Sequence, residues 1–442
     1  MRENFQVQAR FLLGPAGSGK TFRCLAEIRA ALSSSPGGPP LLLLAPKQAT
    51  FQIERQLLAD GEISGFTRLN IFSFDKLARF VFEQLHLAPP KLLSSEGRLM
   101  VLRALLMRHE NELKLFGRSA RRPGFAAELS SLLSELQQHQ FTPTRLRTLA
   151  AEEKVRPELK NKLLDLALVH EKHSSWLVEH ELQDADRLLD FATDALRKLP
   201  KKERNRISIE HLWLDGFAEM TPQELDLLAV VMPFCQSATL AFCLENEAAN
   251  CASRLSIWSA INKTFQQCRA RLASLPDCDI QIEALQRDPL ENRFTGNPDL
   301  RSLELNWAQP TGPAIARNPQ PPSAIRTVAC TNPEAEAIFA AREILRFVRA
   351  GNRFRDCAVL VRSLGAHHQP LGRTFRRYGI PFFLDRREAV NHHPLAEVTR
   401  SALRTVTFDW QHDDWFAALK AGFSPVPETE IDRLENAALE SS

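Results

Sequence analysis

Residues 14–21 read Gly-Pro-Ala-Gly-Ser-Gly-Lys-Thr and match the consensus G-x-x-x-x-G-K-[ST] of a phosphate-binding loop, or P-loop. Glycines let the backbone curl so that successive amide groups point at phosphate oxygens. The lysine of this consensus reaches the β- and γ-phosphates of a nucleotide, and its hydroxyl residue ligates Mg²⁺. The motif therefore predicts a nucleotide site formed by Gly14, Ala16, Gly17, Ser18, Gly19, Lys20 and Thr21.

The segments on both sides of this loop constrain the fold. Apolar residues alternate over 7–13, as in a strand, and recur at helical spacing over 22–32. A loop between a strand and a helix lies at the helix N-terminus, where anions bind. Short apolar runs typical of buried strands recur at 41–45, 69–72, 211–214 and 238–244. Because helical patterns separate these runs, we expect an α/β fold.

The run at 211–215, His-Leu-Trp-Leu-Asp, predicts a second element of the nucleotide site. A strand that ends in Asp (Walker B) supplies a carboxylate that holds Mg²⁺ through water. We therefore predict that Thr21 and Asp215 hold Mg²⁺, Asp215 through water. A hydrolytic motor usually has Glu after this Asp, whereas this chain has Gly216, so we expect nucleotide binding with poor hydrolysis and assign no catalytic residue. Glu219 could replace the missing acid if the backbone turns back.

Composition excludes several classes of protein. The chain has 442 residues, of which 44% are hydrophobic and 25% charged, as expected for a globular protein of two or three domains. No apolar run approaches membrane-spanning length, and the N-terminus lacks a signal-peptide core, so we expect a cytoplasmic protein with no membrane partner. The net charge of +3 neither demands nor excludes nucleic acid, which a local basic face would have to bind.

The periodicity of the chain also predicts its domain organisation. We expect a discontinuous α/β domain at 1–90 and 205–310, interrupted by an all-helical insertion at 91–204. A proline-rich segment at 311–322 is typical of a linker. Residues 323–442 should begin a second, incomplete α/β domain. Its strands are expected at 325–330, 357–361 and 380–384, and its helices at 333–351 and 368–378.

Four segments, taken in chain order, resemble one family. They are the P-loop, Ala-Pro-Lys-Gln-Ala-Thr-Phe-Gln at 45–52, Ile-Phe-Ser-Phe-Asp-Lys-Leu at 71–77 and Leu-Asp-Gly-Phe at 214–217. This series looks like the N-terminal part of AddB, the B subunit of the bacterial AddAB helicase–nuclease. Residues 356–362 and 378–383 resemble the start of the second motor domain of UvrD-like superfamily 1 helicases. The resemblance implies that both α/β domains are RecA-like.

The resemblance also implies a function. It indicates a helicase-like, ATP-binding subunit of a bacterial DNA helicase/exonuclease that processes double-strand breaks for homologous recombination. In this family the partner subunit, AddA, is the ATP-driven motor, and AddB holds single-stranded DNA. The family's Mg²⁺-dependent nuclease and iron–sulfur cluster belong to a C-terminal region that is not found here. We therefore expect an N-terminal fragment whose cofactors are ATP and Mg²⁺ and whose partner is an AddA-like subunit.

In related helicases, the loops after the second and third strands line the DNA path. An aromatic ring beside Lys76 could stack on a base while the ammonium meets phosphate. The alternative is that Phe72 and Phe74 are core residues. The candidate DNA contacts implied by the resemblance are Pro46, Gln48, Phe72, Ser73, Phe74 and Lys76.

Two other functions fit the P-loop. One is a self-sufficient P-loop ATPase or small-molecule kinase, and the other is a non-catalytic structural module whose P-loop only stabilises the fold. A kinase needs an acceptor pocket and a lid, and the long helical insertion with a second α/β domain argues against it.

Overall fold

A computed structural model describes residues 7–59, 65–122, 124–152, 155–200, 203, 206–245, 256–288, 290, 292, 294–306, 324–384, 390 and 393–441. The chain divides into two compact units, Met1–Ile325 and Arg326–Ser442, and each is described by itself. The expected linker at 311–322 lies outside the described residues. Within the described segments, no helix combines the length and the apolar character that crossing a membrane requires.

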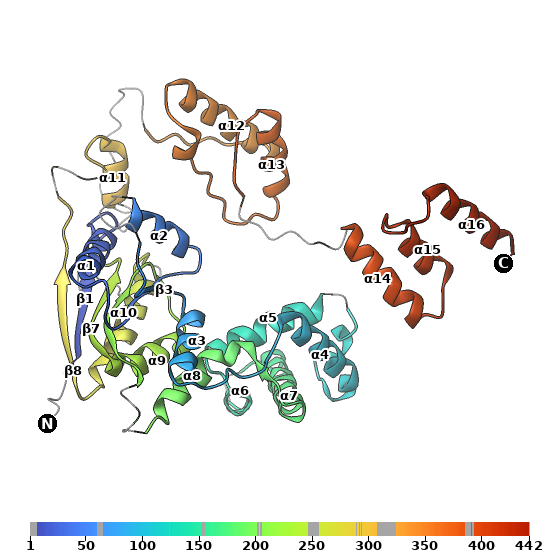
Figure 1. The fold of residues 1–442 in the computed structure, drawn as a ribbon, viewed down its shortest axis with the longest axis horizontal. Helices are drawn as coiled ribbons and strands as arrows, with labels where there is room; N and C mark the ends of the chain where they lie inside the picture. The colour runs from blue at the N-terminus through green and yellow to red at the C-terminus, as the bar shows by residue number, and fades with distance from the viewer. Residues whose placement is uncertain are drawn as a thin grey trace. The chain divides into compact units, whose positions relative to one another are not determined.

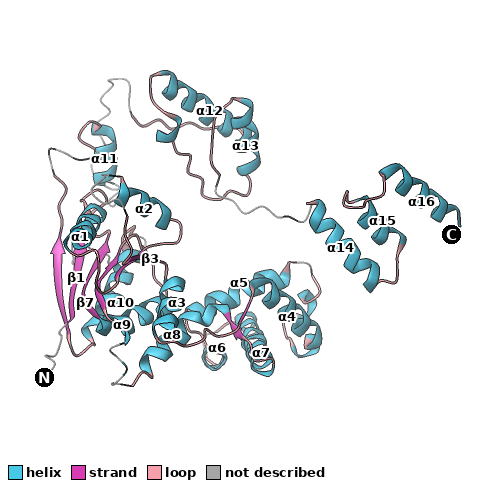
Figure 2. Ribbon diagram, viewed as in Figure 1, coloured by secondary structure: helices cyan, strands magenta, loops and turns pink. Residues whose placement is uncertain are grey.

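The first unit is built on a six-stranded parallel sheet with the strand order β3-β2-β6-β7-β1-β8 (Figures 1 and 2). The strands are β1 (Val7–Leu13), β2 (Leu41–Leu44), β3 (Leu69–Phe72), β6 (Ile209–Leu214), β7 (Cys235–Phe242) and β8 (Cys278–Ala284). In the register of the sheet, β1 and β7 end side by side at Leu13 and Phe242. Similarly, β2 and β6 end at Leu44 and Leu214. The loops that follow the strands therefore meet along one edge, where α/β sheets bind ligands.

Helices cover both faces of this sheet. The helices α1 (Lys20–Ser34) and α2 (Thr50–Leu58) bury one face, which includes Leu43 and Trp213. The other face is covered by α3 (Phe74–Gln84), α8 (Leu188–Arg197), α9 (Pro222–Val231) and α10 (Ser259–Ala273). Because β2 is buried on both faces, its sequence is a continuous apolar run rather than an alternating one. The expected α/β class is confirmed.

Two sequence expectations for this sheet need correction. The strand β8 was not expected. It is an edge strand, and its apolar residues alternate with polar ones at Ile280 and Ile282. In α1 the predicted apolar repeat is buried except for Phe22, which is 71% exposed. Phe22 lies in the first turn of the helix, before the first buried residue, Cys24.

Residues between β3 and β6 form a helical cluster at one end of the first unit (Figure 1). It consists of α4 (Ser95–Arg108), α5 (Phe125–Gln138), α6 (Pro143–Ala150) and α7 (Pro157–Glu179), which share an apolar core. The described residues of the insertion expected at 91–204 are mostly helical, with two differences from the expectation. The short strands β4 (Leu92–Leu93) and β5 (Gln183–Asp184) pair in parallel, because the entering and leaving chain run side by side there. In addition, α8 packs in the core beneath the sheet and not in the cluster.

Among the described residues, the first unit also contains the helix α11 (Pro298–Asn306) and short 3₁₀ turns at Glu110–Glu112, Gly117–Ser119, Ala185–Arg187 and Met232–Phe234.

The second unit is helical in its described residues. It contains α12 (Pro333–Arg349), a 3₁₀ turn at Phe354–Asp356, α13 (His368–Arg377), α14 (Pro394–Thr407), α15 (His412–Lys420) and α16 (Glu428–Ser441). The helices α12 and α13 lie where the sequence predicts them. The strands expected at 325–330, 357–361 and 380–384 are wrong, since these segments have no strand assignment. A strand needs a neighbour to receive its backbone hydrogen bonds, and no ladder forms between the described segments of this unit.

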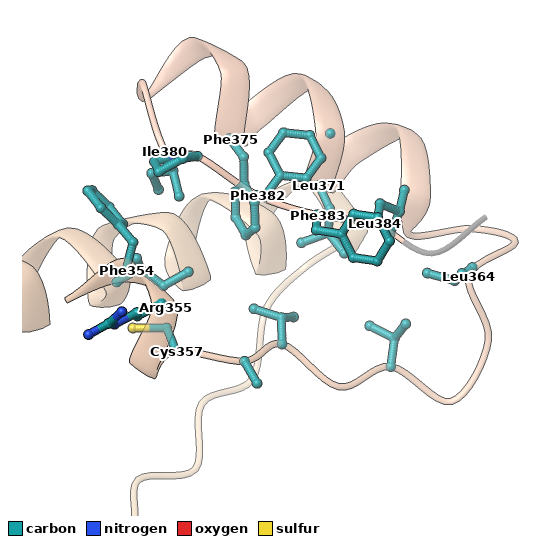
Figure 3. Close-up of a pocket in the computed structure, with 16 residues that line it drawn as sticks. Phe354, Arg355, Cys357, Leu364, Leu371, Phe375, Ile380, Phe382, Phe383 and Leu384 are labelled. Carbon is teal, nitrogen blue, oxygen red and sulfur yellow. The ribbon is translucent and has the colours of Figure 1, made fainter. Parts of the chain in front are cut away.

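Two of these extended segments instead line a pocket with α13 (Figure 3). The pocket has a volume of about 610 Å³ and a largely apolar lining that includes Phe375, Ile380 and Phe382. Apolar side chains of the same segments are also exposed to solvent: Leu360 is 94% exposed, and Phe383, which lines the open pocket, is 89% exposed. The unit thus presents apolar surface where a sheet was expected.

Candidate nucleotide-binding site

The P-loop turns sharply between β1 and α1. Gly17 and Gly19 have φ angles of +85° and +88°, in the left-handed region that favours glycine. A Cβ atom at Gly14 would lie 2.9 Å from the carbonyl oxygen of Leu285, so only glycine fits there. No side chain caps α1 from Gly19, and first-turn amides of a helix are groups that bind phosphate. The loop therefore has the shape and the donors of an anion site.

Lys20 is the cation of this loop. Its Nζ donates hydrogen bonds to the carbonyl oxygens of Gly14 (2.6 Å) and Pro15 (2.9 Å), which hold the ammonium against the loop. A phosphate bound in the loop would offer Lys20 charged oxygens in place of neutral carbonyls, and charge-assisted hydrogen bonds are the stronger kind.

The structure brings the two predicted Mg²⁺ ligands together. The P-loop follows β1 and Asp215 follows β6, and only β7 separates these strands. Thr21 Oγ1 donates a hydrogen bond of 2.6 Å to Asp215 Oδ2. Burial raises the pKa of Asp215, although the Thr21 hydroxyl, the Gly216 amide and the Lys20 ammonium each favour its charged form.

Both groups fit a divalent cation, because Mg²⁺ prefers hard oxygen ligands. One hydroxyl and one carboxylate supply only part of an octahedral shell, however. Mg²⁺ at this pair would therefore depend on waters and nucleotide phosphates for its other ligands.

The backbone geometry at position 216 favours glycine. Its φ angle is +87°, and a Cβ atom there would lie 3.2 Å from Pro46 Cδ. A glutamate at this position would therefore be strained and crowded. Glu219, the alternative source of an acid, is exposed and lines a separate cleft of about 930 Å³ with Arg145 and Lys263.

Sequence reasoning missed Arg287. Its Nε donates a hydrogen bond of 2.7 Å to the carbonyl oxygen of Ala16 in the P-loop, and its Nη1 lies 2.7 Å from Oε2 of Glu304 on α11. This ion pair raises the pKa of Arg287. The residue follows the end of β8, the neighbour of β1, so recognition of β8 as a strand would have placed it beside the loop.

The candidate DNA contacts lie in the loop after β2 and at the junction of β3 with α3, and these adjoin because β2 and β3 are neighbours in the sheet. An ion pair between Lys47 and Asp75 joins the loop after β2 to the first turn of α3. Gln48 and Lys76 are exposed, and Pro46 is half-buried against Gly216. These three residues form an accessible surface beside the nucleotide edge.

The aromatic candidates are less accessible. Phe74 is only 3% exposed, and its ring packs at 5.3 Å from that of Phe217. Ser73 is also buried, and the half-buried Phe72 ring lies 5.6 Å from that of Phe80. Phe74 is thus a core residue in this arrangement, and a base could reach its ring only if the loops opened.

Several known proteins are similar in sequence to this chain. A family model described as "ADDB, N-terminal" matches residues 11–304. The chain is 37% identical over 441 residues to the B subunit of the ATP-dependent helicase/deoxyribonuclease of Symbiobacterium thermophilum, and the match covers 98% of this chain and 37% of the relative. Proteins of the same name from Desulforudis audaxviator and Moorella thermoacetica are 37% and 36% identical, over 97% of this chain and 36% and 37% of their own lengths.

The chain therefore spans only about 37% of the length of such a relative. The matched residues nevertheless include the P-loop, Asp215 and the loops around them. Since these similarities extend along nearly all of its residues, the chain belongs to the AddB family.

Proposed function

We propose that this chain is the N-terminal part of the B subunit of a bacterial DNA helicase/exonuclease that processes double-strand breaks for homologous recombination. Its first unit would be a RecA-like domain that binds ATP with Mg²⁺ at the P-loop. The 2.6 Å hydrogen bond between Thr21 and Asp215 carries this proposal, because it joins the two Mg²⁺ ligands at the ligand-binding edge of a parallel sheet. The relatives' name, which includes ATP dependence and designates one subunit of an assembly, supports it.

The proposal includes the domain boundaries. The RecA-like domain would comprise 1–90 and 205–310, the insertion 91–204 and the linker 311–322. Residues 323–442 would begin a second RecA-like domain. The parallel sheet with helices on both faces supports the first assignment, and the helices α12 and α13 support the second.

Each group at the site has a role in this proposal. The P-loop amides and Lys20 bind the phosphates, and Thr21 and Asp215 hold the metal ion. The ion supplies charge neutralisation at the β- and γ-phosphate oxygens. Gly216 provides no carboxylate to orient water, so ATP would be bound with little turnover. The AddA-like partner would drive movement, while Gln48 and Lys76 contact single-stranded DNA.

A reciprocal pair of lysine variants tests this division of roles. Lys20→Ala should weaken Mg·ATP binding about tenfold or more, the equivalent of about 1.4 kcal/mol or more, and leave affinity for single-stranded DNA unchanged. Lys76→Ala should leave ATP binding unchanged and lower the salt dependence of DNA binding by about 0.7 in the logarithmic slope. Titration calorimetry with ATP and fluorescence anisotropy with a labelled oligonucleotide measure the two affinities.

The outcomes separate this function from its alternatives. ATP titrations that are identical for wild type and Lys20→Ala would favour a structural module. Phosphate release by the wild-type chain at ordinary motor rates, about 1–1,000 s⁻¹, would favour a self-sufficient ATPase. DNA binding that does not weaken with salt would contradict the assigned phosphate contacts.

A further inference from the structure

Glu27 accepts hydrogen bonds from residues of several elements near the proposed nucleotide site. It lies on α1, and its Oε1 accepts from Arg10 Nη2 of β1 (2.5 Å) and from Arg23 Nε of α1 (3.0 Å). Its Oε2 accepts from Trp213 Nε1 of β6 (3.1 Å). One carboxylate thus connects the P-loop helix to two strands of the sheet.

The network continues across the sheet through Arg10. This guanidinium also donates to Thr239 Oγ1 of β7 (3.0 Å) and forms an ion pair with Glu283 of β8 (3.4 Å). Although burial favours the neutral acid, the hydrogen bonds from Trp213, Arg10 and Arg23 keep the pKa of Glu27 below its ordinary value. The charged carboxylate is therefore the form that this network holds.

The network lies close in sequence to both predicted Mg²⁺ ligands. Trp213 is two residues before Asp215 on β6, and Glu27 follows Thr21 on the same helix. The helix α1 and the strand β6 are consequently linked at two points, one between Thr21 and Asp215 and one between Glu27 and Trp213.

The two links differ in what happens when a metal ion arrives. At the first link both groups take part in metal binding, because the Thr21 oxygen would offer a lone pair to the ion and Asp215 would hold the ion through water. The Glu27–Trp213 hydrogen bond involves no ligand and can persist. It can therefore keep α1 and β6 in position while Thr21 and Asp215 take up the metal.

We propose that Glu27 is a positioning residue, which sets the separation of Thr21 and Asp215 for Mg²⁺ by fixing α1 against β6 and β1. This inference rests on the proposed function, since it assumes that the edge binds Mg·ATP. Residues that orient metal ligands from behind typically alter metal affinity about 10- to 100-fold when they are changed.

The test measures how much Mg²⁺ strengthens ATP binding. ATP affinity of the full chain is determined with Mg²⁺ and with a chelator, and the ratio of the two is the Mg²⁺ enhancement. Glu27→Ala should reduce this enhancement about tenfold. Its ATP affinity in chelator should stay within about twofold of wild type, because the P-loop and Lys20 are untouched. Glu27→Gln should reduce the enhancement less, since its amide oxygen can still accept from Trp213.

Glu210→Ala is the matched control. Glu210 lies at the amino end of β6, the strand that also carries Trp213. Its Oε2 accepts a hydrogen bond of 2.5 Å from the buried Arg68. Loss of this ion pair should lower the melting temperature without changing the Mg²⁺ enhancement. Should Glu27→Ala fail to fold, Trp213→Phe removes the same hydrogen bond from the strand side, and it should also reduce the enhancement.

The results distinguish this inference from the proposed function. A wild-type chain that binds no ATP would overturn both. If the wild-type chain shows a clear Mg²⁺ enhancement and Glu27→Ala fully retains it, only the positioning role is overturned. The same result from Trp213→Phe, where it replaces Glu27→Ala, would also overturn that role alone. An equal loss in Glu210→Ala, or an equal loss with and without Mg²⁺, would also overturn it, because it would show a general structural effect.

Discussion

Two short apolar segments, one in each unit, differ in whether they form a strand. Leu41–Leu44 has hydrogen-bonded strands on both sides and helices on both faces, and all of its residues are buried. Residues 357–361, Cys-Ala-Val-Leu-Val, have no strand partner among the described residues, and Leu360 is exposed. The difference shows that strand propensity reports a fit to neighbours more than an intrinsic backbone preference.

Helices do not show this difference. Both α1 in the first unit and α12 in the second form where their periodicity predicts them. A helix satisfies its backbone hydrogen bonds within the segment, whereas a strand depends on residues far away in sequence. The expectations for the second unit therefore hold for its helices and fail for its strands.

The largest expected effect comes from a matched pair of leucine truncations. Leu43→Ala should lower the free energy of unfolding by about 2–5 kcal/mol, because it removes a buried side chain from β2. Leu360→Ala should change it by less than about 0.5 kcal/mol, because the side chain has few neighbours to lose. Urea unfolding followed by circular dichroism measures both. Comparable losses from the two truncations would contradict the contrast between the segments.

Acid should destabilise the sheet through His211 on β6. Its ring nitrogens lie 2.6 Å from Ser237 Oγ and 3.0 Å from Thr239 Oγ1, and burial lowers its pKa to about 4 from 6.5. The unfolded chain binds the proton more readily than the folded chain does. The stability that neutral His211 contributes is therefore complete above about pH 6.5 and is lost as the pH falls toward about 4. The loss should reach up to about 3 kcal/mol.

The variant His211→Gln isolates this contribution from that of the carboxylates, which titrate in the same range. Urea unfolding of wild type and variant at a series of pH values should give a difference that shrinks as the medium becomes more acidic. A pH-independent difference would show that His211 does not titrate in this way.

Glycine substitutions compare backbone strain in the two units. Gly216→Glu should cost about 1–2 kcal/mol, because a side chain at its positive φ is strained. Crowding against Pro46 should add to this cost. Gly379→Glu is the matched control in the second unit, since Gly379 has a φ of +66° but no atom within 4 Å of its added Cβ. Its cost should be the smaller of the two in thermal unfolding.

The same Gly216 variant tests the site. Gly216→Glu should not speed ATP turnover, because the strained turn does not place the new carboxylate beside the nucleotide. Phosphate release is measured with Lys20→Ala as the blank. A clear rise above wild type would mean that this turn tolerates a working acid.

The proximity of the residues in the proposed nucleotide site could be predicted from sequence. Lys20 and Thr21 are fixed in the P-loop consensus, and Asp215 ends an apolar run that must join the same parallel sheet. Parallel strands end at a common edge, so pattern and topology together are enough to predict their proximity.

Residues whose role depends on packing between distant segments could not be predicted. Arg287 meets Ala16 across 271 positions of sequence, and no local pattern encodes that contact. The sequence around Phe74 does not distinguish a ring that faces DNA from one in the core. The contact of its ring with that of Phe217 places it in the core. The fold likewise departs from expectation at β8, where an edge strand lacks a continuous apolar run.

Hydrogen exchange with and without Mg·ATP tests the central claim most directly, namely that the carboxyl edge of the parallel sheet is the nucleotide site. Mg·ATP should slow amide exchange at 14–21 and 215–217 and leave 357–361 and 380–384 unchanged, and Lys20→Ala should abolish the protection. Unchanged exchange in the P-loop, or equal protection in wild type and Lys20→Ala, would contradict the account.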